Sequence, residues 1–329
     1  MQARLRNGVK WLAAVTTAGM FIVLVMGSTV TNTGSAAGCG ADWPLCNGQF
    51  IPEFAVHTAI EFSHRAVTGL EGLLIVATSI GVLLFWRQRR EAQVLVPLMI
   101  FFLFLQAGLG ALAVMYSTSS TILALHFGIS LLAFASILLT TLLIWQIDNG
   151  VDALRDRPLP SGARWAIWGL SVYTYGVVYL GAYVNHTNAS LACLDWPLCQ
   201  GSVFPGFTGP VGIVFSHRLA AAILTLGIGG LVAWCWRERV RRPDLYWTGL
   251  IAIVTLLSQS AAGAAVVFSR VNLFSALAHG AIVTLFFGAM TYLCLHSLPR
   301  PRAIRQQAGS VAPEPGPPVY APRVTRVGV

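Results

Sequence analysis

Two long stretches of this chain, residues 11–30 and 94–146, carry no acidic or basic side chain apart from one histidine. About 20 apolar residues in a helix are enough to cross the hydrocarbon core of a membrane. Only 10% of the 329 residues are charged and the mean hydropathy is +0.69, whereas about 25% of a soluble domain is charged. The sequence therefore predicts an integral membrane protein. The expected spans are 11–31, 58–86, 94–115, 121–146, 165–184, 211–236, 246–268 and 273–296.

The net charge of +9 is unevenly distributed along the chain. Arginine and lysine gather before the first span, in every second loop and after the last span, whereas the other loops carry only Arg270. This is the positive-inside pattern, so we expect both termini in the cytoplasm. It also accounts for the basic charge without nucleic-acid binding. No cleavable signal or transit peptide is evident, which favours a bacterial plasma membrane protein.

The chain also contains an internal repeat. Asp-Trp-Pro-Leu-Cys at 42–46 recurs at 195–199, and Phe-Ser-His-Arg at 62–65 recurs at 215–218. Both recurrences have an offset of 153 residues, as have three further matches. Each half contains four of the expected spans, so the second half enters the membrane in the same direction as the first. We predict an all-α membrane fold with eight transmembrane helices, arranged as two tandem, parallel-repeat four-helix bundles.

Polar segments mark the boundaries of these bundles. We expect the first bundle at 1–147, a cytoplasmic linker at 148–164 and the second bundle at 165–298. The remaining tail, 299–329, is rich in proline and poor in apolar residues, and it is predicted to be disordered in the cytoplasm.

Four histidines lie inside the expected spans at repeat-matched positions, and ionisable residues in membranes are usually functional. At ~1.5 Å per residue, His64 and His126 both lie roughly 8–10 Å from the outer side. His217 and His279 repeat these depths. Each half thus offers two imidazoles at one level on two helices, as bis-histidine heme ligation requires. The alternatives are core histidines bonded to carbonyls, or zinc, which needs three or four close ligands.

Two further pairs of repeated residues accompany the histidines. Arg65 and Arg218 directly follow span histidines, and each either reaches the membrane interface or pairs with a heme propionate. Gln106 and Gln259 lie beside small residues in the third and seventh spans. These segments either pack closely against neighbouring helices or make room for a macrocycle that the glutamine lines.

The two halves differ in their carboxylates. Glu61 lies one turn before His64, whereas Val214 occupies the matching position of the second half. A carboxyl in hydrocarbon must be protonated or partnered, and it is suited to proton transfer or to stabilising positive charge. We interpret Glu61 as catalytic. Glu71 also lacks a counterpart in the second half, and it is either catalytic or structural. His57 lies one turn outside Glu61, and it is either a proton relay or a histidine of the membrane interface.

Cysteines occur in pairs in the first and third outer loops. Cys39 and Cys46 are close in sequence, as are Cys193 and Cys199, and the outer side of the membrane is oxidising. We predict a disulfide within each loop, although pairing between the loops is a further possibility. Each disulfide is either a structural staple or a redox pair that exchanges with a thiol protein.

Taken together, these residues resemble those of the heme A synthase family across about residues 10–296. The resemblance implies oxidation of a ring methyl of heme O to a formyl group, which gives heme A for cytochrome oxidase. It implies a heme b cofactor in the second half and the substrate heme in the first. The implied ligands of the cofactor are His217 and His279, and we expect Arg218 and Gln259 beside it. The implied substrate-site residues are His64, His126, Arg65, Gln106 and the catalytic Glu61.

The resemblance is compatible with several partners, and two other functions are alternatives to it. Partners would include heme O synthase, oxidase assembly factors, membrane lipid, and an electron acceptor or thiol-redox partner at the outer face. One alternative is a dihemic electron-transfer cytochrome, which has no use for a carboxylate in one half only. The other is a heme transporter or chaperone, which needs a path across the membrane although all four histidines lie near one face.

Overall fold

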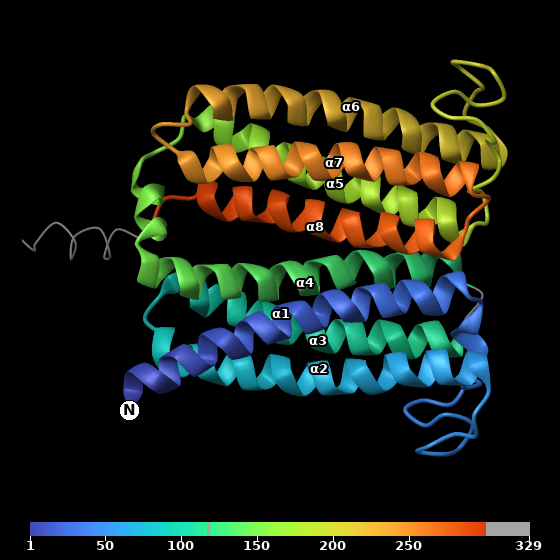
Figure 1. Ribbon diagram of the computed structural model, residues 1–329, viewed down its shortest axis with the longest axis horizontal. Coiled ribbons are helices and arrows are strands. Elements are labelled where there is room, and N and C mark those ends of the chain that lie inside the picture. Colours follow the sequence, from blue (N-terminus) through green and yellow to red (C-terminus); the bar gives the residue numbers. More distant parts are fainter. Residues whose placement is uncertain (117–118, 301–329) are drawn as a thin grey trace, which may run out of the picture.

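The computed structural model describes residues 1–116 and 119–300, and the expected tail lies outside this part of the chain from residue 301 on (Figure 1). The described residues fold into helices without a β-strand. The α-helices are α1 Gln2–Asn32, α2 Val56–Trp86, α3 Arg90–Met115, α4 Ser120–Asn149, α5 Ser161–His186, α6 Gly209–Arg237, α7 Pro243–Phe268 and α8 Leu273–Ser297. Two short 3-10 helices, η1 Ser35–Ala37 and η2 Val151–Asp156, lie in the connections.

All eight α-helices are long and apolar enough to cross a membrane, which confirms the predicted spans. The first helix begins at Gln2 rather than at residue 11. Its polar first turns continue the helix because Arg6 and Lys10 both pair with Asp148 at the end of α4, at 2.5 Å in each case. Two ion pairs therefore join the start of α1 to the end of α4.

Local sequence signals set several helix ends. Asn272 caps α8, because its side-chain oxygen accepts a hydrogen bond of 2.9 Å from the backbone N–H of Phe274. Gly150 ends α4 with a φ of +72°, a left-handed conformation that glycine adopts without steric cost. Pro243 occupies the first turn of α7, where a missing N–H costs no helical hydrogen bond.

The helices form two groups that lie side by side (Figure 1). Helices α1–α4 contact one another in the first group, and α5–α8 contact one another in the second. The groups meet through α1, α4, α5 and α8, where Phe134, Val178 and Phe287 are buried together. That these groups are tandem repeats stays a prediction from the sequence.

One end of the molecule holds the N-terminus and the short connections α2–α3, α4–α5 and α6–α7 (Figure 1). We call it the basic end, because the arginine-rich loops lie there. The opposite end holds the two long connections α1–α2 and α5–α6, with all four loop cysteines. We call it the disulfide end.

The segment 148–164, the expected linker, connects the two helix groups and is itself folded. It contains the end of α4, the 3-10 helix η2 and the start of α5. Arg155 is buried there and donates to Glu91 at 2.8 Å and to Asp152 at 3.0 Å. The polar side chains of this segment thus include buried ion pairs.

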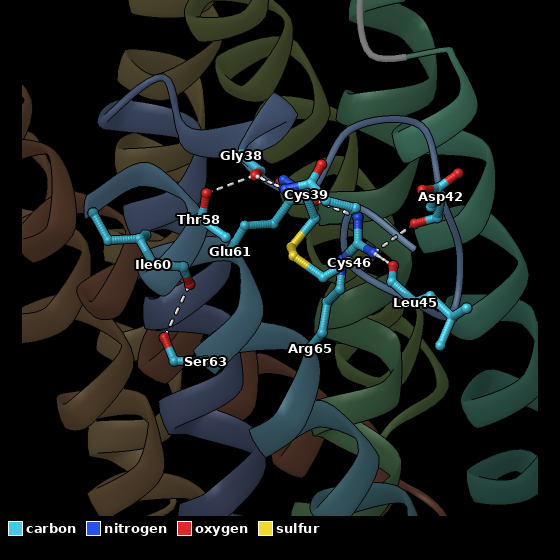
Figure 2. Close-up of a disulfide and its surroundings, with 11 residues drawn as sticks. Gly38, Cys39, Asp42, Leu45, Cys46, Thr58, Ile60, Glu61, Ser63 and Arg65 are labelled. Atoms are coloured by element: carbon cyan, nitrogen blue, oxygen red, sulfur yellow. Dashed lines mark hydrogen bonds and ion pairs between the residues drawn. A yellow bond between two sulfur atoms is a disulfide. The ribbon is translucent and has the colours of Figure 1, made fainter. Parts of the chain in front are cut away.

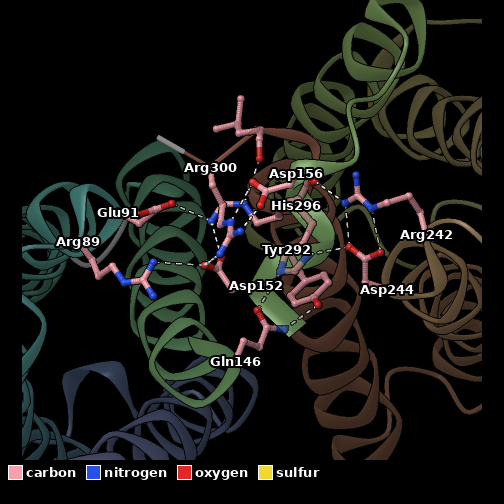
Figure 3. A network of polar contacts seen from close by, with 12 residues as sticks. Arg89, Glu91, Gln146, Asp152, Asp156, Arg242, Asp244, Tyr292, His296 and Arg300 are labelled. Atoms are coloured by element: carbon pink, nitrogen blue, oxygen red, sulfur yellow. Dashed lines mark hydrogen bonds and ion pairs between the residues drawn. The ribbon is translucent and has the colours of Figure 1, made fainter. Parts of the chain in front are cut away.

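A buried polar network joins the two helix groups at the basic end (Figure 3). Arg242 donates to the Asp244 carboxylate at 3.0 and 2.8 Å, and Asp244 also lies 2.7 Å from Nδ1 of His296. Nε2 of His296 lies 2.8 Å from Oε1 of Gln146, which belongs to α4 of the first group. Each of these four side chains thus has a partner, as a low-dielectric interior requires.

Asp244→Ala should strongly destabilise the protein, because it leaves the Arg242 guanidinium buried beside no carboxylate. Breaking a buried ion pair in this way costs about 3–5 kcal/mol, and denaturation in mixed micelles would measure it. Glu238→Ala is the matched control, because Glu238 pairs with Arg241, which is half exposed, and should cost about 1 kcal/mol or less. Equal losses for the two variants would contradict the role assigned to the network.

Candidate functional site

The four span histidines lie on four different helices. His64 and His126 are on α2 and α4 of the first group, and His217 and His279 are on α6 and α8 of the second. Each lies within the first three turns of its helix, counted from the disulfide end. The structure thus places the two histidines of each group near the same end of that group, on two different helices.

Each histidine ring packs against a glycine of a neighbouring helix. A Cβ atom at any of these glycines would lie close to the Cε1 atom of the ring. The distances are 3.3 Å for Gly27 and His64, 3.4 Å for Gly110 and His126, 2.7 Å for Gly181 and His217, and 3.3 Å for Gly263 and His279. A larger residue would push the ring aside, so these glycines help to set the positions of the imidazoles.

All four imidazoles have a buried Nδ1 atom without a hydrogen-bond partner among the described residues. Such atoms are rare in folded proteins and call for a ligand or another explanation. In the first group, Nε2 of Gln106 lies 3.2 Å from Nε2 of His126, and in the second group the Gln259–His279 distance is 3.0 Å. The repeated glutamines therefore contact the repeated histidines directly.

Glu61 is buried and makes two polar contacts at the disulfide end (Figure 2). Its Oε1 lies 2.5 Å from Nη2 of Arg65, and its Oε2 accepts a hydrogen bond of 2.8 Å from the backbone N–H of Cys39. The sequence required this carboxyl to be protonated or partnered, and the structure supplies the partner. A carboxyl group next to a histidine pair is thus fixed in position by a charge and by a disulfide-bonded loop.

The two repeated arginines hold the outer loops. Arg65 donates to the backbone carbonyls of Asp42 and Leu45, at 2.7 Å in both cases (Figure 2). Arg218 donates to the carbonyls of Asp195 and Leu198 and, at 3.2 Å, of Cys193. The guanidinium groups therefore point towards the loops, and their pairing with a heme propionate stays a prediction.

Both outer loops are closed by a disulfide. Cys39 bonds to Cys46 and Cys193 to Cys199, which confirms the predicted pairing within each loop. In the second loop the backbone N–H groups of Gly201 and Gln200 donate to the Asp195 carboxylate, at 2.7 Å each. These bonds hold the pKa of Asp195 below its usual value.

The other two residues that the sequence analysis singled out do not contact the histidine pairs. Glu71 is buried against α1, where a side chain at Gly19 would overlap its carboxyl, and its Oε1 has no hydrogen-bond partner among the described residues. His57 is exposed, and its Nδ1 lies 3.0 Å from Oγ of Ser35. The contact of His57 fits a structural role at the loop, whereas Glu71 keeps no assigned role.

Sequence reasoning missed one residue of the first site. Ser130 lies one turn after His126, donates to its carbonyl oxygen at 2.8 Å and receives a hydrogen bond from Gln106. Its repeat-matched position holds Val283, so the same comparison that found Glu61 would have found Ser130. The first group is therefore the more polar of the two around its histidines.

The residues present fit a heme held in each group. Two buried imidazoles on two helices of one group, each with an unpartnered Nδ1 atom, suit a macrocycle with axial histidines. Zinc fits less well, because residues 1–116 and 119–300 contain no cluster of three or more His, Cys, Asp or Glu side chains that would hold a metal ion.

Comparison with known proteins identifies the family. The model of the cytochrome oxidase assembly protein family matches residues 10–291. A heme A synthase from Geobacillus kaustophilus is 42% identical, over 95% of this chain and 99% of the relative. Another, from Symbiobacterium thermophilum, is 41% identical over 86% of this chain and 93% of the relative. The chain belongs to the heme A synthase family. It is therefore a multi-pass membrane enzyme of heme A biosynthesis, acting in cytochrome oxidase assembly.

Proposed function

We propose that this enzyme oxidises a ring methyl of heme O to the formyl group of heme A, with the substrate in the first helix group and a heme b cofactor in the second. The observation that carries this proposal is the difference between two otherwise similar histidine pairs. Glu61 is held beside the first pair by Arg65 and by the Cys39 N–H. Val214 stands at the corresponding place beside the second pair.

In the second group, His217 and His279 would be the axial ligands of heme b. Gln259 contacts His279 and would orient its ring, and Gly181 leaves room for the ring of His217. Arg218 holds the loop that covers this end of the group. A heme bound between these histidines supplies one-electron chemistry. The second group has Val214 instead of a carboxylate at the position that matches Glu61. The absence of a proton acceptor there suits a cofactor that is not itself modified.

In the first group, His64 and His126 would flank the substrate heme, with Gln106 and Ser130 beside His126. Oxidation of a methyl group to a formyl group releases protons, so the site needs a proton acceptor. Each Glu61 oxygen accepts one hydrogen bond, and a carboxylate oxygen has a second lone pair that is free to accept a proton. We assign Glu61 as this acceptor and Arg65 as the residue that positions it.

The membrane orientation follows from the charges. The basic end would face the cytoplasm of a bacterial cell, with both termini, and the disulfide end would face outward. The substrate would come from heme O synthase, and the product would pass to oxidase assembly factors. Cys39–Cys46 would be either a staple or the contact of a thiol-redox partner, and the electron acceptor would also act at this face.

His217→Ala should abolish the bis-histidine heme spectrum of protein purified from cells that make heme b but no heme O. The reason is that a resident heme in the second group loses one axial ligand. Absorption spectra of the reduced protein measure this loss. His64→Ala is the matched control and should keep the spectrum, whereas loss of the spectrum in His64→Ala alone would place the resident heme in the first group.

Glu61→Gln should lower heme O conversion by about 100-fold or more, because it keeps the shape of the side chain and removes its proton-accepting charge. Conversion is measured in membranes that contain equal amounts of each variant. The cofactor spectrum should be unchanged, since that heme lies in the other helix group. Near-normal heme A production by Glu61→Gln would contradict the catalytic assignment and would favour a purely structural role for Glu61.

A further inference from the structure

A cavity of about 310 Å³ lies at the basic end of α5, far from the histidine pairs. It is lined by Ser161, Arg164, Trp165, Trp168 and Leu298. One wall is fixed, because Nε1 of Trp168 donates to Oγ of Ser297 in α8 at 3.1 Å. The cavity therefore lies between the first turns of α5 and the last residues of α8.

Arg164 has no acidic side chain within ion-pair distance among the residues that the structure describes. Its Nε atom is buried and has no hydrogen-bond partner there. Other arginines at the same end, such as Arg155 and Arg242, are buried in ion pairs. A partly buried guanidinium with an unpaired N–H is costly, so this cavity suits an anion from outside the chain.

The first helix group provides an internal comparison. The last turns of α1 and α5 and the loops that follow them match with an offset of 154 residues: Gly27 with Gly181, Thr33 with Thr187, and Cys39 with Cys193. The same offset matches Lys10-Trp11 with Arg164-Trp165.

In the first group this basic residue is neutralised by the chain itself. Nζ of Lys10 lies 2.5 Å from the Asp148 carboxylate at the end of α4 and 5.3 Å from the centre of the Trp145 ring. In the second group, α8 ends at Ser297, and none of the described residues brings a carboxylate to Arg164. The cavity thus lies where the first group has an ion pair.

We propose that this cavity binds the phosphate headgroup of an anionic membrane lipid, such as phosphatidylglycerol. The planar guanidinium of Arg164 matches a phosphate through two parallel N–H donors. Trp165 is 76% exposed and Trp168 is 39% exposed, as expected of aromatic side chains at the depth of lipid headgroups. Since the cavity opens beside membrane-spanning helices, a lipid rather than a free phosphate ion is the occupant that the surroundings favour.

The proposal is independent of the assignment of the heme sites, and lipid binding tests it directly. Native mass spectrometry of the purified full-length protein would follow titration with phosphatidylglycerol or with phosphatidylcholine of the same chain length. We expect one molecule of phosphatidylglycerol to bind more tightly than phosphatidylcholine. Arg164→Gln should weaken this binding about tenfold or more. Arg90→Gln is the matched control, because it removes the same charge from an exposed arginine of the basic end and should change binding by about twofold or less.

Further arms separate the possible sources of the anion. Arg164→Lys keeps the charge but loses the two parallel N–H donors of the guanidinium, so an intermediate affinity supports phosphate recognition. This variant also tests the proposal if Arg164→Gln does not fold. Inorganic phosphate at millimolar concentration should not displace the lipid, and displacement would overturn the lipid assignment. Equal binding of the two phospholipids, or equal effects of Arg164→Gln and Arg90→Gln, would overturn the proposal.

Discussion

A polar group inside the hydrocarbon core must find a partner within the protein, because water is absent there. This constraint accounts for the main contacts of the molecule. Glu61 lies between Arg65 and the Cys39 N–H, and the Arg242–Asp244–His296 network satisfies its members at the opposite end. The groups that stay unpartnered are therefore informative, and the Nδ1 atoms of all four span histidines are among them.

The proposed function assigns different chemistry to two helix groups with matched positions. The framework is shared: histidines packed on glycines, glutamines on histidines, and arginines that hold the disulfide-bonded loops. Among the positions beside the histidines, Glu61 and Ser130 in the first group correspond to Val214 and Val283 in the second. In the proposed function, a reaction site and a cofactor site therefore share one architecture.

The spans, the histidine pairs and the pairing of the cysteines were predictable, because each depends on a pattern that is local or repeated in the sequence. The loop contacts were not. Arg65 binds the carbonyls of Asp42 and Leu45, and the backbone N–H of Cys39 donates to Glu61. Both sets of contacts depend on the path of the loop in space. The contacts of the linker 148–164 were unpredictable for a similar reason, since Arg155 pairs with Glu91, which is distant in sequence.

The central claim is that the two histidine pairs hold different hemes, one resident and one passing through. Heme extraction and mass analysis of the purified protein test it most directly, with protein made in cells that produce heme b only and in cells that also produce heme O. The account predicts one heme b per chain from the first cells, and the same heme b together with heme O or heme A from the second. Two hemes b per chain from both kinds of cell would contradict it and would favour a dihemic electron-transfer protein.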